Sequence, residues 1–108
     1  MHFTENRVAQ YFIDTVLRDP DKSITVYGEG EYADVKKSRE HMTVLDNMGQ
    51  CDFDHVAVWS DDEDKYVGSF MFVYGNVTSH SEAIEVISDY TVNEYADNIY
   101  NQVEEMTQ

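Results

Sequence analysis

The sequence predicts an α+β domain, with a small antiparallel sheet of about four strands, arranged as two hairpins, and helices packed on one face. Apolar residues recur at helical spacing near both ends of the chain, which predicts N- and C-terminal helices. Two pairs of alternating or apolar runs lie between them, each pair joined by a short polar turn. Such hairpins, flanked by helices rather than alternating with them strand by strand, favour an α+β fold. We expect residues 1–108 to form a single compact acidic domain, because 108 residues suffice for one modest core.

The first part of the chain predicts a helix followed by a hairpin. Val8, Phe12 and Val16 share one helical face, which predicts a helix over 5–18. The Asp19-Pro20 step ends it, since the residue before proline disfavours helical geometry. The alternating run "SITVYGEGEYADVKKS" then predicts two strands around Gly28-Glu29-Gly30.

The middle of the chain predicts a short helix and a second hairpin. Ser38 is suited to cap a helix over 39–48 that ends at Gly49. The runs "DHVAVW" and "KYVGSFMFVYG" predict two paired strands, and the second has apolar residues on both faces, as expected of a central strand. The acidic stretch 61–64 between them is expected to be the hairpin turn.

The last part of the chain predicts two further helices. Ser79 with Glu82 fits a capping box, which predicts a short helix over 80–88. Thr91 with Glu94 fits another and predicts a terminal helix that extends to about residue 106. Its apolar stripe is expected to be Ala96, Ile99, Val103 and Met106.

Net charge is the most unusual property of the chain, since 22 acidic and 7 basic residues give −15 at pH 7. Residues 1–39 carry seven acids and six bases, whereas residues 40–108 carry fifteen acids and one base, Lys65. Such a chain repels phosphates and anionic lipids, so we expect no direct binding to nucleic acid or membrane. Solubility and adaptation to high salt are alternative reasons for acidity. Salt adaptation would acidify the whole surface, so the asymmetry favours an acidic surface directed at a basic partner.

We expect this surface to combine the acids of the second half with two aromatic anchors. Acids three or four residues apart on a helix lie about 5–6 Å apart, and alternate strand residues about 6.6 Å apart. A DNA duplex carries one charge per about 1.7 Å, so such spacing copies part of its charge density. Tryptophan and tyrosine commonly anchor protein interfaces. The predicted partner-binding residues are Asp52, Asp54, Trp59, Asp61, Asp62, Glu63, Asp64, Tyr66, Glu82, Glu85, Asp89, Glu94, Asp97, Glu104 and Glu105.

Metal and nucleophile sites are weaker alternatives. Residues 61–64 lack the alternating ligands and the glycine of a calcium loop. Cys51 and His55, with His41 and His80 elsewhere, lack the paired spacing of a structural zinc site. An acidic neighbourhood also disfavours a reactive Cys51 thiolate. We therefore expect no metal, no cofactor and no catalytic residue.

Three segments carry a resemblance to a known group of proteins: "SITVYGEGEYADVKKS", "GSFMFVYGN" and "EVISDYTVNEY". Together they span roughly residues 24–95, and they resemble motifs of small acidic phage-encoded proteins. This chain departs from their pattern at the first turn, where it reads Gly28-Glu29-Gly30. The resemblance implies a phage origin and no catalytic residues. By analogy, it implies a counter-defence role of the anti-CRISPR or anti-restriction type.

The expected function follows from charge and resemblance together. We expect a non-enzymatic, DNA-mimic-like inhibitor that occupies a basic nucleic-acid-binding site of a host defence protein, such as a CRISPR effector or restriction enzyme. The alternative is an acidic adaptor that assembles with other proteins without blocking nucleic acid. The single cysteine excludes an internal disulfide and, with the absence of a long apolar run or a signal-peptide pattern, predicts an intracellular protein. The phage resemblance implies that its location is the host bacterial cytoplasm. Monomer and homodimer remain open.

Overall fold

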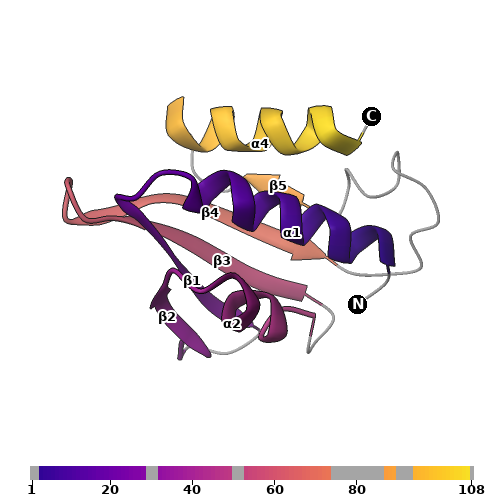
Figure 1. Cartoon of the computed structure of the whole chain (residues 1–108), viewed down its shortest axis with the longest axis horizontal. Helices are drawn as coiled ribbons and strands as arrows, with labels where there is room; N and C mark the ends of the chain where they lie inside the picture. Colours follow the sequence, from indigo (N-terminus) through magenta and orange to yellow (C-terminus); the bar gives the residue numbers. More distant parts are fainter. Residues whose placement is uncertain (1–2, 29–31, 50–52, 74–86, 90–93, 108) are drawn as a thin grey trace.

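Three helices cover one face of a five-stranded antiparallel sheet (Figure 1). The computed structural model describes residues 3–28, 32–49, 53–73, 87–89 and 94–107. Along the chain, the elements are α1 (Phe3–Leu17), β1 (Lys22–Gly28), β2 (Val35–Ser38), α2 (His41–Asp46), β3 (Phe53–Ser60), β4 (Lys65–Val73), β5 (Ile87–Asp89) and α4 (Glu94–Thr107). The predicted α+β fold with helices at both ends is confirmed.

The strands lie in the order β2-β1-β3-β4-β5, so the two hairpins meet where β1 pairs with β3. Because side chains alternate between the faces of a strand, the register divides the sheet into two chemically different faces. Val26 pairs with Val56 and Val58 pairs with Gly68 on the face beneath the helices. On the other face, Thr25 lies opposite Ala57. No described helix covers this second face, which is called the uncovered face below.

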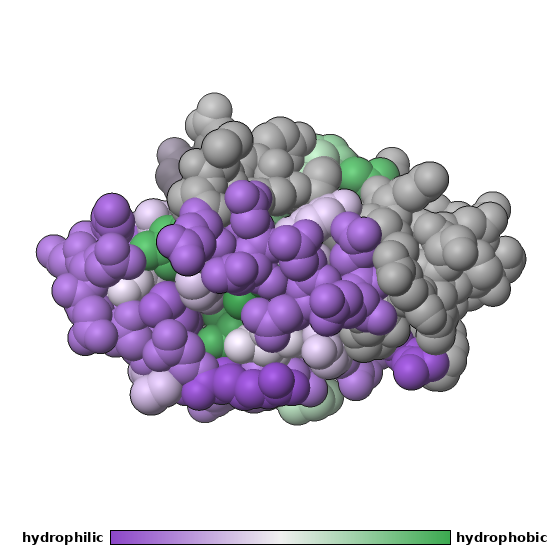
Figure 2. Space-filling model, turned by 90° about the horizontal axis from the view of Figure 1, so that it is seen from above, coloured by the Kyte–Doolittle hydropathy of each residue, from purple (hydrophilic) through white to green (hydrophobic). Residues whose placement is uncertain are grey.

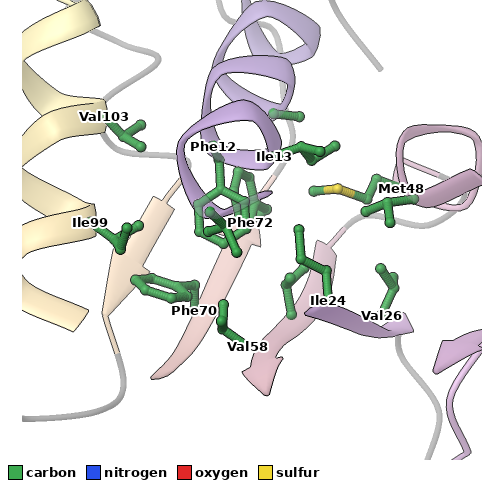
Figure 3. Packing of buried hydrophobic residues seen from close by; sticks show 14 of the residues in the cluster. Phe12, Ile13, Ile24, Val26, Met48, Val58, Phe70, Phe72, Ile99 and Val103 are labelled. Atoms are coloured by element: carbon green, nitrogen blue, oxygen red, sulfur yellow. The ribbon is translucent and has the colours of Figure 1, made fainter. Parts of the chain in front are cut away.

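The core forms where α1 packs on the middle of the sheet (Figure 3). Phe12 is fully buried, and its ring meets Phe70 at 5.0 Å and Phe72 at 5.1 Å between centroids, edge to face in both cases. This is the arrangement that aromatic quadrupoles favour. The helical repeat of α1 places Val8 and Val16 in the same buried cluster. One helix face therefore packs on both buried phenylalanines of β4.

The other two helices extend this core toward the sheet edges. Ala96, Ile99 and Val103 of α4 are buried, which confirms the predicted stripe as far as it is described. Val44 and Met48 place α2 and the residues after it in the same cluster (Figure 3). Ser38 does not cap α2 as predicted, because it belongs to β2. Its hydroxyl accepts a hydrogen bond from the Glu40 backbone N–H at 3.1 Å.

The predicted helix over 80–88 is wrong at its C-terminal end. Ile87–Asp89 form strand β5, in which Phe70 pairs with Asp89 and Phe72 with Ile87. The apolar β4 offers unpaired backbone groups at this edge, and pairing a short segment there satisfies them, which outweighs a local capping pattern. Residues 80–86, and the predicted capping box at Ser79 and Glu82, lie outside the described residues.

Phe12→Ala is expected to destabilise the protein by about 3–5 kcal/mol, because it leaves a cavity between α1 and the two phenylalanines of β4. Urea unfolding followed by circular dichroism measures this as a lower midpoint. Tyr32→Ala is the matched control, since Tyr32 is 87% exposed, and it should change the free energy of unfolding by less than about 0.5 kcal/mol. A loss at Phe12 no larger than at Tyr32 would contradict this packing.

Candidate functional site

The acidic turn between β3 and β4 is held in place by Asp21, a residue that follows α1. The Asp21 carboxylate accepts hydrogen bonds from the Ser60 hydroxyl at 2.6 Å and from the Asp62 backbone N–H at 2.5 Å. The Asp21 backbone carbonyl also accepts from the Asp61 N–H at 3.0 Å. A buried Ser60 hydroxyl in turn accepts from the Glu63 N–H at 3.2 Å. The turn backbone is therefore fixed, and its four acidic side chains are exposed.

Lys22 supplies the positive charge that keeps Asp21 ionised. Its ammonium group lies 2.7 Å from the Asp21 carboxylate and 3.1 Å from that of Asp19, and Lys22 is only 8% exposed. The hydrogen bond from Lys22, followed by that from Ser60, lowers the Asp21 pKa from 3.8 to about 2. Burial works to lower the Lys22 pKa, but the hydrogen bonds to Asp21 and Asp19 outweigh it and raise the pKa.

Arg39 fixes the loop that carries these residues. Its guanidinium group donates to the backbone carbonyls of Leu17 and Asp19, both at 3.1 Å, and also to that of Lys22. The first of these carbonyls belongs to the C-terminal end of α1, where carbonyl groups lack helical partners. Lys22 is thus paired with carboxylates within the structure, whereas Arg39 is exposed and bonds to neutral carbonyls, so it keeps its positive charge at the surface.

A groove of about 460 Å³ separates the turn from the first turn of α4. Glu63 of the β3–β4 turn and Glu94 of α4 both line it, together with Lys65. In Figure 1 the turn lies at the end of the molecule where α4 begins. Two acidic segments that are far apart in sequence therefore meet at one place, while Asp97 lies one helical turn further along α4 and is exposed.

We call the exposed acids Asp61, Asp62, Glu63, Asp64, Glu94 and Asp97 the acidic end. Seen from the α4 side, the coloured surface is mostly hydrophilic, with only small, separated hydrophobic areas (Figure 2).

Tyr95 lines the groove beside Glu94. Burial raises the pKa of its phenol to about 12, and its hydroxyl makes no hydrogen bond with the described residues.

The other predicted acids have different positions. Asp54 does not belong to a partner-facing surface, because its side chain is 0% exposed and accepts a 2.7 Å hydrogen bond from the Gly49 N–H. Glu105 is exposed and Glu104 is half-buried, both near the far end of α4. Asp89 lies in strand β5. Contrary to the prediction, it therefore does not share a helical face with other acids. Asp52, Glu82 and Glu85 lie outside the described residues.

Trp59 and Tyr66, the two predicted aromatic anchors, pair across the hairpin on the uncovered face of the sheet. Their rings meet edge to face with centroids 5.0 Å apart. The Trp59 indole N–H donates to the Asp61 carboxylate at 3.0 Å, so this aromatic pair borders the acidic end. Lys37 Nζ lies 3.5 Å from the Trp59 ring centroid, within the range of a cation–π interaction.

The alternatives of a metal or nucleophile site receive no support from the geometry around His55. The His55 ring shares a hydrogen bond with the Ser69 hydroxyl and lies beside the Tyr27 ring at 5.5 Å. Cys51 and His80 are outside the described residues. Within the described ranges, no group of three His, Cys, Asp or Glu side chains could hold a metal ion, and no helix is long and apolar enough to cross a membrane.

Sequence reasoning missed Asp21, Lys22, Arg39 and Lys37. The first three act through contacts between loops that are distant in sequence, for which the local pattern holds no signal. Strand alternation would place Lys37 on the same face as the buried Val35, and the register shift between β1 and β2, with a positive φ at Lys37, brings it to the face of Trp59 instead.

Asp21→Asn is expected to reduce stability at neutral pH and to flatten its decline in acid. The unfolded carboxyl, with a pKa near 3.8, binds protons more tightly than the folded one, with a pKa of about 2. The stabilisation is therefore complete above the unfolded value and is lost as pH falls through the folded value. Urea unfolding at a series of pH values measures both effects.

Asp64→Asn is the matched control, because it makes the same chemical change in an exposed side chain of the turn. Asp64 has a positive φ of 54°, a conformation that asparagine tolerates. This variant should keep the acid-dependent decline of the parent protein. An unchanged decline in Asp21→Asn would show that Asp21 does not carry this stabilisation.

Comparison with known proteins gives no relationship from which a function could be transferred. No family model matches the chain, and no curated protein or solved structure is significantly similar to it. The resemblance to small phage proteins therefore stays a prediction. A proposal for this protein depends on its own residues, of which the acidic end and the uncovered face are the two notable groups.

Proposed function

We propose that this chain is a non-enzymatic binding protein whose acidic end occupies a cationic, nucleic-acid-binding site on another protein. One observation carries the proposal: Glu63 and Glu94 line the same groove, with three further acids of the turn exposed beside them. Lys65 is the cation that lines this groove with them. A partner with clustered lysine or arginine side chains would regain the ion pairs that it makes with phosphates.

Self-repulsion among these acids gives a reason to expect a partner. Like charges a helical turn apart cost a few tenths of a kcal/mol each, and ordinary surfaces relieve this by mixing signs. The acidic turn is nevertheless held rigidly by Asp21 and Ser60. A fixed array loses little conformational freedom on binding, which favours affinity.

The phage resemblance suggests which partner this is. We propose a host defence protein that binds nucleic acid, such as a CRISPR effector or a restriction enzyme, in the cytoplasm of an infected bacterium. Inhibition would follow from competition for the same basic site. The chain would need no cofactor for this role.

An adaptor function is the second candidate, and the uncovered face supports it. Tyr66 is 39% exposed and Val73 45% exposed in β4, where a protein partner that leaves nucleic acid bound could pack. Such an interface would depend on aromatic contacts and only weakly on salt.

Charge reversal at two positions tests the proposed mimicry. Asp62→Lys with Glu63→Lys changes exposed side chains of the turn and leaves the Trp59–Asp61 hydrogen bond intact. Because close charge pairs at interfaces couple by about 1.5–7 kcal/mol, partner affinity should fall at least about tenfold. The partner is first captured from bacterial lysate on the immobilised protein at low salt, and affinity is then measured over a salt series with and without competing DNA.

Asp34→Lys with Glu105→Lys is the matched control, since it makes the same change in net charge at exposed residues outside the acidic end. It should weaken binding far less than the turn variant. The proposal predicts steep salt dependence and displacement by DNA. A captured partner that binds this protein and DNA together, with an affinity independent of salt, would support the adaptor function and rule out mimicry.

A further inference from the structure

The uncovered face of the sheet carries a hydrogen-bonded group of aromatic and hydroxyl side chains. The Thr25 hydroxyl oxygen accepts from the Lys37 backbone N–H at 3.0 Å and lies 3.4 Å from the Tyr66 hydroxyl. Either of these two hydroxyls can donate in this contact. The pKa of Tyr27 is raised, first by hydrogen bonding with Tyr66 and then by burial.

The Tyr66 hydroxyl hydrogen-bonds with Thr25 and Tyr27 and is partly exposed, so it can also donate to a ligand. Burial works to raise the Tyr66 pKa, but these two hydrogen bonds and the ammonium groups of Lys37 and Lys36 lower it overall. A phenol that is more acidic than usual, and 39% exposed, is a good hydrogen-bond donor to an anion.

Two lysines give this part of the surface a positive charge. Lys36 and Lys37 are exposed, and no described carboxylate forms an ion pair with either. Lys37 has a positive φ of 52°, which is uncommon for a residue with a side chain, and its ammonium group lies over Trp59. This backbone conformation places two consecutive lysines beside the tyrosines.

A pocket of about 380 Å³ lies among these groups and is lined by Thr25, Tyr27, Tyr32, Ala33, Lys36 and Tyr66. Its volume falls at the lower end of the range for small-molecule sites. Tyrosine rings provide stacking surface, while the Lys36 ammonium and the Tyr66 hydroxyl provide two donors for an anion. The pocket therefore combines flat apolar surface with a localised positive charge.

We infer that this pocket binds a small molecule that has a planar ring and one anionic group, either a phosphate or a carboxylate. The ring would stack on Tyr27 or Tyr32, and the anion would accept hydrogen bonds from Lys36 and Tyr66. This function goes beyond the proposed binding of a basic partner and uses the opposite kind of chemistry. The two sites adjoin at Tyr66 of the β3–β4 hairpin, which lines both the groove of the acidic end and this pocket.

Charge also limits the ligand to a small anion. Trp59 connects this face to the turn acids through its hydrogen bond with Asp61, so a long polyanion that follows the sheet would meet the acidic end. The carboxylates of the acidic end would repel the phosphates of a nucleic-acid strand, whereas a ligand whose one anionic group lies at Lys36 avoids this repulsion.

Fluorescence of Trp59 provides a direct test, because it is the single tryptophan of the chain and its ring contacts Tyr66. Adenosine monophosphate and 4-hydroxybenzoate represent the phosphate and the carboxylate form of the ligand. Adenosine and inorganic phosphate are the matched probes that lack the anion or the ring. At least one of the first two should bind with a dissociation constant below the millimolar range, and both matched probes should bind about tenfold more weakly or not at all.

Two substitutions locate the site. Lys36→Gln and Tyr66→Phe each remove one donor and should weaken binding about tenfold and severalfold, respectively. Lys65→Gln is the control, since Lys65 is exposed and lines the groove of the acidic end. It makes the same change in charge and should alter affinity by less than about twofold. Circular dichroism and thermal melting of each variant confirm that the fold is kept.

Three outcomes would overturn the inference. The first is that neither ring-bearing anion changes Trp59 fluorescence or gives heat in calorimetry at millimolar concentration. The second is that adenosine binds as tightly as its monophosphate, which removes the anion from recognition. The third is that Lys65→Gln weakens binding as much as Lys36→Gln, which would place the ligand elsewhere or make its attraction nonspecific.

Discussion

The hydrogen bonds of Asp21 are the constraint on which the arrangement of this surface depends. One carboxylate joins the loop after α1 to the β3–β4 turn through Ser60 and the Asp62 N–H. Lys22 and Arg39 hold that loop in turn. The same contacts therefore determine where the acidic side chains lie relative to α4. Without them, a hairpin tip with four adjacent carboxylates would extend away from the body of the protein to reduce its own repulsion.

This arrangement separates structural charge from surface charge. Asp21, Lys22 and Arg39 bond to one another or to backbone groups, and Asp54 is buried against Gly49. The acids of the turn and of the first turn of α4 remain exposed. The acidic side chains of the turn are thus not neutralised by Lys22, which is paired with Asp19 and Asp21. An acidic end that is not neutralised from within is the property that a basic partner could use.

Much of the fold could be predicted from the sequence, because periodicity is a local signal. The apolar repeats of α1 and α4 and the alternation of β3 place each element close to its observed bounds. The burial of Asp54 could have been anticipated from its position, because it lies on the same strand face as Val56 and Val58, which are buried. The general preference of aspartate for the surface predicts exposure instead. Strand β5 could not be predicted, since a three-residue strand is stabilised by the edge of β4 and not by its own sequence.

A bulge in the β3–β4 hairpin explains why two surfaces of opposite chemistry lie so close together. Val58 pairs with Gly68 and Trp59 with Tyr66, which leaves Val67 as an additional residue in β4. In an unbroken register Tyr66 would lie opposite Ser60, whose buried hydroxyl bonds to Asp21 on the helix side. A shift of one residue moves a side chain to the other face of a sheet, so the bulge directs Tyr66 to the uncovered face. It also leaves Val67 in the core and Lys65 beside Glu94. One inserted residue thereby gives the hairpin an acidic groove on one side and an aromatic, cationic pocket on the other.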